Sequence, residues 1–171
     1  MILKRIKSKL KNQDGMSFTE LLATLLILLM VTSIVAGGIP AAIQAYKKIV
    51  DTANAQILMS TMTNALRNEL GHANKIQASD TTISYSKNGL DYKITQDDDI
   101  QVEVKNPYQD MSAEYLLVSE AVSKNQGLDI SYESVEQAEN NVVFKNIVVE
   151  KNGQELAKLP EYVLLGGGES E

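Results

Sequence analysis

An uninterrupted apolar run constrains this sequence more than any other feature. From Leu21 to Ile39 the chain has 19 residues without a charged side chain. As an α-helix this run would be about 28 Å long at about 1.5 Å per residue, close to the roughly 30 Å thickness of a bilayer's hydrocarbon core. The run is also longer than the roughly 7 to 15 apolar residues of a signal peptide, and no evident cleavage turn follows it. The sequence therefore predicts a membrane-spanning helix that is retained.

Charge is distributed unevenly around this run. The 171 residues have a net charge of −6. The first 15 residues carry five bases against one acid, Asp14, so this leader is +4, and the 11 bases and 21 acids that follow sum to −10. Because basic flanks stay on the cytoplasmic side of a membrane helix, we expect a cytoplasmic amino end, with residues from about 44 onward outside. The acidic remainder also predicts no direct nucleic-acid binding, which needs clustered Lys and Arg.

The residues that most enzyme and metal sites use are scarce. The chain has no Cys, and His72 is its only His. This excludes a thiolate nucleophile and a Cys-based metal site, and it leaves His72 without companion ligands. The run Asp97-Asp98-Asp99 lacks the ligand spacing of a calcium loop and is interpreted as a solvated turn. We therefore predict no catalytic residue, no metal and no cofactor.

An acidic residue stands at the threshold of the apolar run. Glu20 directly precedes Leu21, and an ionised carboxylate inside lipid costs about 2.5 to 3.5 kcal/mol on insertion scales. Helix capping is one explanation, because Ser17 and Glu20 have the spacing of a capping box and a carboxylate in the first turn suits the helix dipole.

A second explanation comes from the wider context. A short basic leader ending in Gly15, then Met-Ser-Phe-Thr-Glu-Leu-Leu, then an apolar helix resembles the processing site of type IV prepilins and pseudopilins. The resemblance implies that prepilin peptidase cuts between Gly15 and Met16 and that the same enzyme methylates the new amine of Met16. It matches Glu20 to the family's acidic residue, four positions beyond the new terminus. The family's usual first residue, phenylalanine, stands two positions late as Phe18, yet only the cut after Gly15 keeps the spacing to Glu20.

The resemblance, which covers residues 1 to about 45, implies a structural role and not an enzyme. The chain would be a pilin or pseudopilin, with a minor subunit favoured, in a type IV pilus, competence pseudopilus or type II secretion-like filament. Its implied partners are prepilin peptidase, membrane lipid, other subunits bound through the N-terminal helix, an assembly ATPase and a membrane platform protein. Pairing of the Met16 amine with Glu20 of an adjacent subunit would set the stagger between subunits. Ser33 and Gly37 supply a small-xxx-small face for helix packing.

The helix is expected to continue beyond the membrane. Gly37, Gly38 and Pro40 weaken the helix at the outer end of the run, and we predict a kink near Pro40 because helical periodicity resumes at Gln44. Apolar side chains then recur with helical spacing and are expected to pack on a sheet. These residues are Tyr46, Ile49, Val50, Ala53, Ile57, Leu58, Met62, Ala65, Leu66 and Leu70.

Beyond residue 80 the apolar period changes to alternation, which predicts an antiparallel sheet of five or six strands. The expected strands are Thr82 to Ser86, Leu90 to Thr95, Ile100 to Val104, Leu128 to Glu133, Val142 to Glu150 and Glu155 to Leu165. Asn88-Gly89 indicates a hairpin turn. Residues 112–124 have two interpretations: a strand at Tyr115 to Val118, or an irregular segment with one turn of helix, which is the one we adopt. Pro160 predicts an edge strand or a bulge, because it has no N–H to donate.

The predicted fold class is therefore α+β, a pilin-like lollipop with a long N-terminal helix packed on an antiparallel sheet. The expected divisions are a leader (1–15), a transmembrane or filament-core helix (16–43), an extracytoplasmic head (44–165, with helix 44–72) and a flexible tail (166–171). After processing the chain would lie in a cell-surface filament. The alternative is a single-pass membrane-anchored protein with an acidic extracellular binding domain and a retained leader. An enzymatic head ranks third.

Overall fold

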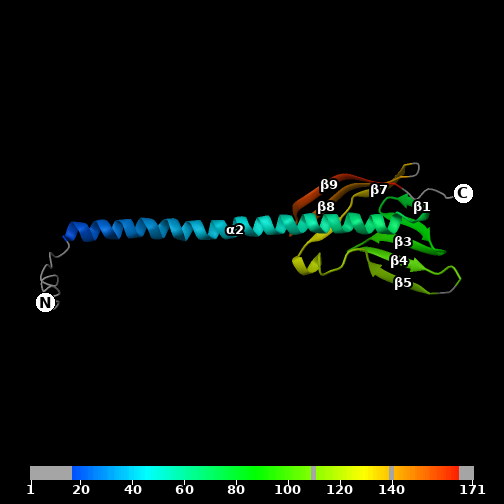
Figure 1. Ribbon diagram of the computed structural model, residues 1–171, viewed down its shortest axis with the longest axis horizontal. Coiled ribbons are helices and arrows are strands. Elements are labelled where there is room, and N and C mark those ends of the chain that lie inside the picture. The colour runs from blue at the N-terminus through cyan, green and yellow to red at the C-terminus, as the bar shows by residue number, and fades with distance from the viewer. Residues whose placement is uncertain (1–16, 109–110, 139–140, 166–171) are drawn as a thin grey trace, which may run out of the picture. The chain divides into compact units, whose positions relative to one another are not determined.

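The computed structural model describes residues 17–108, 111–138 and 141–165 of the chain (Figure 1). Helix α2 (Phe18–Leu70) comes first, and antiparallel strands with one short 3-10 turn, η1 (Lys124–Gln126), follow it. The chain divides between Lys47 and Lys48 into two compact units. The predicted α+β class, with a long apolar N-terminal helix and an antiparallel sheet, is confirmed.

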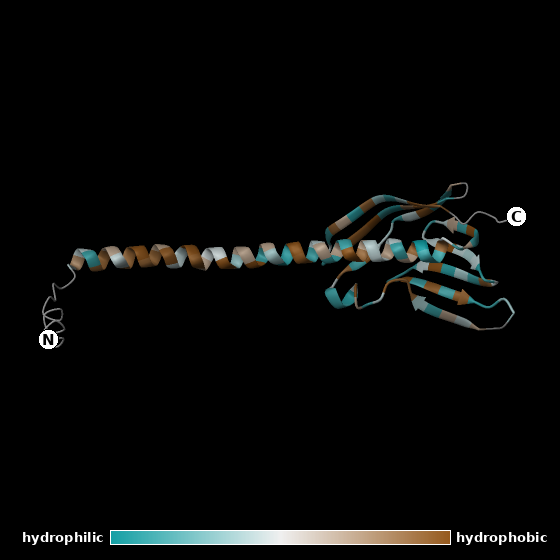
Figure 2. Cartoon of the chain, in the orientation of Figure 1, coloured by the Kyte–Doolittle hydropathy of each residue, from teal (hydrophilic) through white to brown (hydrophobic). Residues whose placement is uncertain are grey.

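The first half of helix α2 is mostly hydrophobic, as the hydropathy colouring in Figure 2 shows. Two threonine hydroxyls in this part bond within the helix: Thr24 and Thr32 donate to the carbonyls of Glu20 and Leu28, at 2.8 and 2.9 Å. Such bonds satisfy the hydroxyls without a partner outside the helix. The helix continues through Pro40 without a break, although proline removes one backbone hydrogen bond there.

The last part of α2, from Lys48 to Leu70, belongs to the second unit, which we call the head (residues 48–165 as described). One stripe of this part is fully buried: Ala55, Leu58, Met62, Leu66 and Leu70. The expectation that Tyr46, Ile49, Ala53 and Ile57 also pack on a sheet is wrong, because all four are exposed. Tyr46, Ile49 and Ile57 are 69%, 68% and 57% exposed. Helical periodicity locates apolar positions, but it does not say which of two neighbouring stripes meets the sheet.

The first sheet of the head, sheet A, has five antiparallel strands in sequential order: β1 (Asn74–Ser79), β2 (Thr82–Lys87), β3 (Leu90–Gln96), β4 (Ile100–Lys105) and β5 (Ser112–Leu116). Strands β2, β3 and β4 lie where the alternation predicted them. Asn88 and Gly89 join β2 to β3 with φ of 54° and 77°, which is the left-handed backbone that this hairpin turn requires.

Two strands of sheet A were not predicted. Residues 112–116, interpreted as irregular, form β5, and residues 74–79, which follow the expected helix 44–72, form β1. Both are edge strands of the sheet, and neither contains a fully buried residue. An edge strand exposed to water needs no alternation of apolar and polar residues, so the pattern that reveals a strand is missing.

A second sheet, sheet B, corrects the expectation of a single sheet. It contains β6 (Asp129–Ser131), β7 (Ser134–Ala138), β8 (Asn141–Lys151) and β9 (Gln154–Leu165). Strand β8 pairs with β6 and β7 and also with β9. Of the described strands, β9 pairs with β8 alone, so the edge position predicted from Pro160 is confirmed.

The core of the head lies among α2 and the two sheets. Tyr132 and Phe144 meet edge to face in it, with ring centroids 5.4 Å apart. The side-chain amide of Gln96, on β3, makes two hydrogen bonds with the backbone of Tyr132. The Tyr132 N–H donates to Gln96 Oε1 at 2.8 Å, and Gln96 Nε2 donates to the Tyr132 carbonyl at 3.1 Å. The Tyr132 hydroxyl donates to the Thr81 carbonyl at 2.7 Å, and burial raises its pKa to about 12. These bonds join the segment after β6 to sheet A.

A glutamate fastens sheet A to the end of α2. The Glu69 carboxylate accepts hydrogen bonds from the hydroxyls of Tyr85 at 3.1 Å and Tyr115 at 3.0 Å, one on each oxygen. Lys87 Nζ lies 3.5 Å from the same carboxylate. Burial, together with the charge of Glu69, raises the pKa of both tyrosines. Residues 69 and 115 are 46 positions apart in the chain, so the contact exists only in the folded head.

Candidate functional site

The first turn of α2 is capped by its own side chains. Ser17 precedes the helix, and its backbone N–H donates to Glu20 Oε2 at 3.1 Å. Its carbonyl accepts the first helical hydrogen bond, from the Glu20 N–H at 2.8 Å. The Ser17 and Thr19 hydroxyls are hydrogen-bonded at 2.7 Å. This is the carboxylate half of a capping box, as the spacing of Ser17 and Glu20 indicated.

Capping leaves part of the Glu20 carboxylate available. No hydrogen bond to Glu20 Oε1 is found in residues 17–108, 111–138 and 141–165, and the side chain is exposed. The carboxylate can therefore cap its own helix through one oxygen and meet a positive charge through the other. Gly15 and Met16, the predicted cleavage residues, lie outside the described residues, while Phe18 begins the helix with 76% of its surface exposed.

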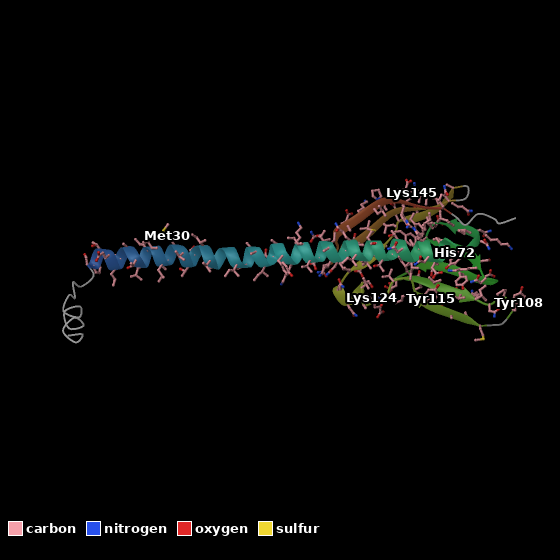
Figure 3. The ribbon with its side chains drawn as sticks, viewed as in Figure 1. Met30, His72, Tyr108, Tyr115, Lys124 and Lys145 are labelled. Carbon is pink, nitrogen blue, oxygen red and sulfur yellow. The ribbon has the colours of Figure 1, made fainter. Side chains whose placement is uncertain are left out.

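Behind this turn, α2 presents an apolar surface that nothing in the described chain covers. Met30, at the centre of the apolar run, is 69% exposed, and Figure 3 shows it projecting from the helix. Among the described residues, α2 is the one helix long and apolar enough to cross a membrane, judged by length and composition. Exposed apolar surface of this extent requires lipid or protein around it.

The predicted packing residues lie on this exposed part of the helix. Ser33 and Gly37 are one turn apart, and a Cβ placed on Gly37 or Gly38 would meet nothing within 4 Å. A glycine with open space beside it lets the backbone of another helix approach closely. Pro40 is likewise exposed inside the helix.

The exposed surface extends further along the helix than the sequence indicated. Ile49, Ala53 and Ile57, which we call the exposed stripe, lie on the head part of α2 with their side chains in solvent. The stripe was predicted as core, and only its exposure in the folded head identifies it as a candidate contact surface.

Nothing in the described part of the chain resembles a metal centre. There, no group of three or more His, Cys, Asp or Glu side chains is placed to hold a metal ion. His72 follows the end of α2 with its side chain exposed, as Figure 3 shows. Asp99 of the acidic run pairs with Lys124.

Comparison of the chain with protein-family models, with curated proteins and with solved structures gives no match.

Proposed function

We propose that the protein is a prepilin-type subunit, processed after Gly15 and assembled into a filament through α2. One observation carries the proposal: Glu20 lies in the first turn of a helix whose next 19 residues are uncharged and exposed, shortly after a basic leader that ends in glycine. An exposed apolar helix needs lipid before assembly and other helices after it. The acidic head stays in water, and its role is structural.

Processing creates a positive charge that can pair with the Glu20 carboxylate. Hydrolysis of the Gly15–Met16 peptide bond removes the +4 leader and leaves an ammonium group at Met16. In a bundle of apolar helices this charge is costly unless it is paired. Glu20 of a neighbouring subunit offers the opposite charge through the carboxylate oxygen that does not cap its own helix. The pairing then sets the stagger of neighbouring subunits.

The alternative function is a single-pass membrane anchor for an acidic binding head, with the leader retained. The capping hydrogen bond favours this alternative, because the bond from the Ser17 N–H is enough to explain why the helix has a carboxylate at position 20. In this alternative the Met16 amine never forms, and Glu20 has no partner in another subunit.

The identity of the first residue of the chain in cells distinguishes these two functions. When the full chain is produced together with prepilin peptidase, we expect mass spectrometry to find a chain that begins at N-methylated Met16. Gly15→Leu is expected to block the cut, and Gly38→Leu serves as the control because Gly38 lies in open space inside the helix. An intact amino terminus in the presence of active peptidase would contradict the proposal.

Glu20→Gln tests charge pairing apart from capping. A glutamine oxygen also accepts the Ser17 N–H, since capping boxes use Glu or Gln, so helix α2 and processing should be unchanged. The charge is lost, however, and an unpaired buried ammonium costs about 3 to 5 kcal/mol. We expect at least a tenfold loss of incorporation into filaments, measured by co-purification with wild-type subunits at equal processing. Normal incorporation of this variant would rule out the charge pair.

A further inference from the structure

The outer face of sheet A is hollowed. Of the residues that line the hollow, Tyr85 alone takes part in a contact described so far, its hydrogen bond to Glu69. Ile83, Ile94 and Val102 are fully buried on the inner face. Because side chains alternate along a strand, their neighbours point outward. A hollow of about 380 Å³ lies on this outer face across β1 to β4. Small-ligand sites commonly have volumes of about 300 to 1,000 Å³.

An irregular strand places one lysine at the hollow. The register of β1 against β2 shifts between Asn74 and Gln77, and Lys75 has a φ of 53°. Asn74 pairs with Ser86 and Gln77 pairs with Ser84, and both of these serines line the hollow. The extra residue lets Ile76 pack against the core while Lys75 lines the hollow. A left-handed non-glycine residue costs of order 1 to 3 kcal/mol, and such strain concentrates at binding sites.

The acids of the hollow leave two lysines without an ion pair. Glu103 lies directly opposite Lys93 on the neighbouring strand, yet its carboxylate binds Lys105, at 3.0 Å. Asp91 accepts a hydrogen bond from Ser86 at 2.8 Å. Within the described residues, no carboxylate lies within 4.0 Å of the ammonium groups of Lys75 or Lys93.

The net charge of the hollow is opposite to that of the chain around it. Its three lysines and two acids sum to +1, whereas the residues after the leader sum to −10. Two free ammonium groups favour an anionic group on the ligand. The hydroxyl of Ser84, the amide of Gln77 and the carboxylates supply donors and acceptors of the kind that sugar hydroxyls bond.

We propose that this hollow binds an anionic, hydroxyl-rich ligand, namely a sugar or polyol unit that carries a phosphate or a carboxylate. Lys75 and Lys93 hold the anionic group, and the polar side chains between them bond the hydroxyls. The site belongs to the head and does not depend on processing or filament assembly. It would give an exposed subunit a means to bind acidic polysaccharides or phosphorylated wall polymers.

Titration calorimetry on the full chain in detergent tests the site with five probes: glucose 6-phosphate, glycerol 3-phosphate, glucuronate, inorganic phosphate and glucose. The first three should bind, and glucose should not. Glucose 6-phosphate should bind about tenfold more tightly than inorganic phosphate, a difference of about 1.4 kcal/mol. Binding of phosphate as tight as that of the sugar phosphate would overturn the hydroxyl-rich class, and no binding by any anionic probe would overturn the site.

A double variant tests whether the probes bind at the outer face of sheet A. Lys75→Asn combined with Lys93→Gln removes both free charges, and Asn tolerates the left-handed backbone at position 75. We expect binding at least about tenfold weaker. Lys158→Gln removes an exposed lysine of β9 from the other sheet and should leave binding unchanged. Unchanged binding in the double variant, or an equal loss in Lys158→Gln, would place any binding elsewhere and overturn the proposal.

Discussion

Leu66→Ala is expected to lower the free energy of unfolding of the head by about 2 to 5 kcal/mol, the usual cost of truncating a buried leucine. Leu66 is fully buried on the face of α2 that meets the core. Alanine keeps the helix propensity, so the loss comes from the apolar contacts and the cavity left behind. Since a whole domain has only about 5 to 15 kcal/mol of stability, this loss is a large fraction of the stability of the head.

Urea unfolding of the full chain in detergent, followed by near-UV circular dichroism of the tyrosines, measures this change. Ile57→Ala is the matched control, because Ile57 lies on the same helix with 57% of its surface exposed. We expect it to change the free energy of unfolding by less than about 0.5 kcal/mol. Equal losses in the two variants would mean that the exposed stripe is covered within the head and that α2 packs differently from the structure.

Leu26→Arg combined with Met30→Arg is expected to remove the chain from the membrane. The two positions lie one turn apart in the apolar run and are 55% and 69% exposed. Each arginine near the bilayer centre costs about 2.5 to 3.5 kcal/mol on insertion scales, so the pair costs about 5 to 7 kcal/mol. Carbonate extraction of membranes from cells that produce the full chain should find the double variant in the soluble or aggregated fraction and the wild type in the pellet.

The control for this experiment carries the same charges further along the helix. Ile49→Arg with Ile57→Arg changes two residues that are 68% and 57% exposed but lie beyond the apolar run. We expect this variant to stay in the membrane pellet like the wild type. If both double variants behaved alike, the span from Leu21 to Ile39 would not be the part of α2 that lies in lipid.

The sequence predicted those parts of the fold that depend on residues near one another in the chain. The length of α2 follows from the uncharged run from Leu21 to Ile39 together with the helical periodicity that resumes at Gln44. The hairpin of β2 and β3 follows from Asn88-Gly89, because that pair adopts the left-handed backbone of a tight turn at little cost. Asn152 and Gly153 form the same kind of turn between β8 and β9, with φ of 52° and 75°. The cap of α2 likewise needs only Ser17 and Glu20, three residues apart.

The sequence did not predict β1, β5 or β7, nor the division of the strands into two sheets. These strands are mostly exposed, so they lack the alternation by which the central strands were recognised. The partition into two sheets depends on contacts such as that between Gln96 and Tyr132, which are 36 residues apart. Contacts between residues so far apart in the chain produce no pattern within a short stretch of sequence, so the division into two sheets could not be predicted.

One candidate site depends on residues near one another in the chain, and the other depends on residues that only the fold brings together. Gly15, Met16, Phe18 and Glu20 stand out because they lie within six positions of one another, so composition and spacing carry the signal. Their roles remain predictions for the processing and incorporation experiments. The hollow of sheet A has no linear signal, because its residues come from four strands spread over residues 74–105.

The sequence by itself determined that this chain has a membrane-compatible helix, a basic leader and an acidic remainder, since hydrophobicity and charge act through local composition. Only the tertiary structure decided which face of α2 is buried. It also decided that Ile49 and Ile57 stay exposed and that Lys75 and Lys93 line one hollow, with no ion pair to either among the residues that the structure describes. Those outcomes follow from the packing and register of segments far apart in the chain, because burial and charge pairing are properties of the assembled neighbours and not of any one segment.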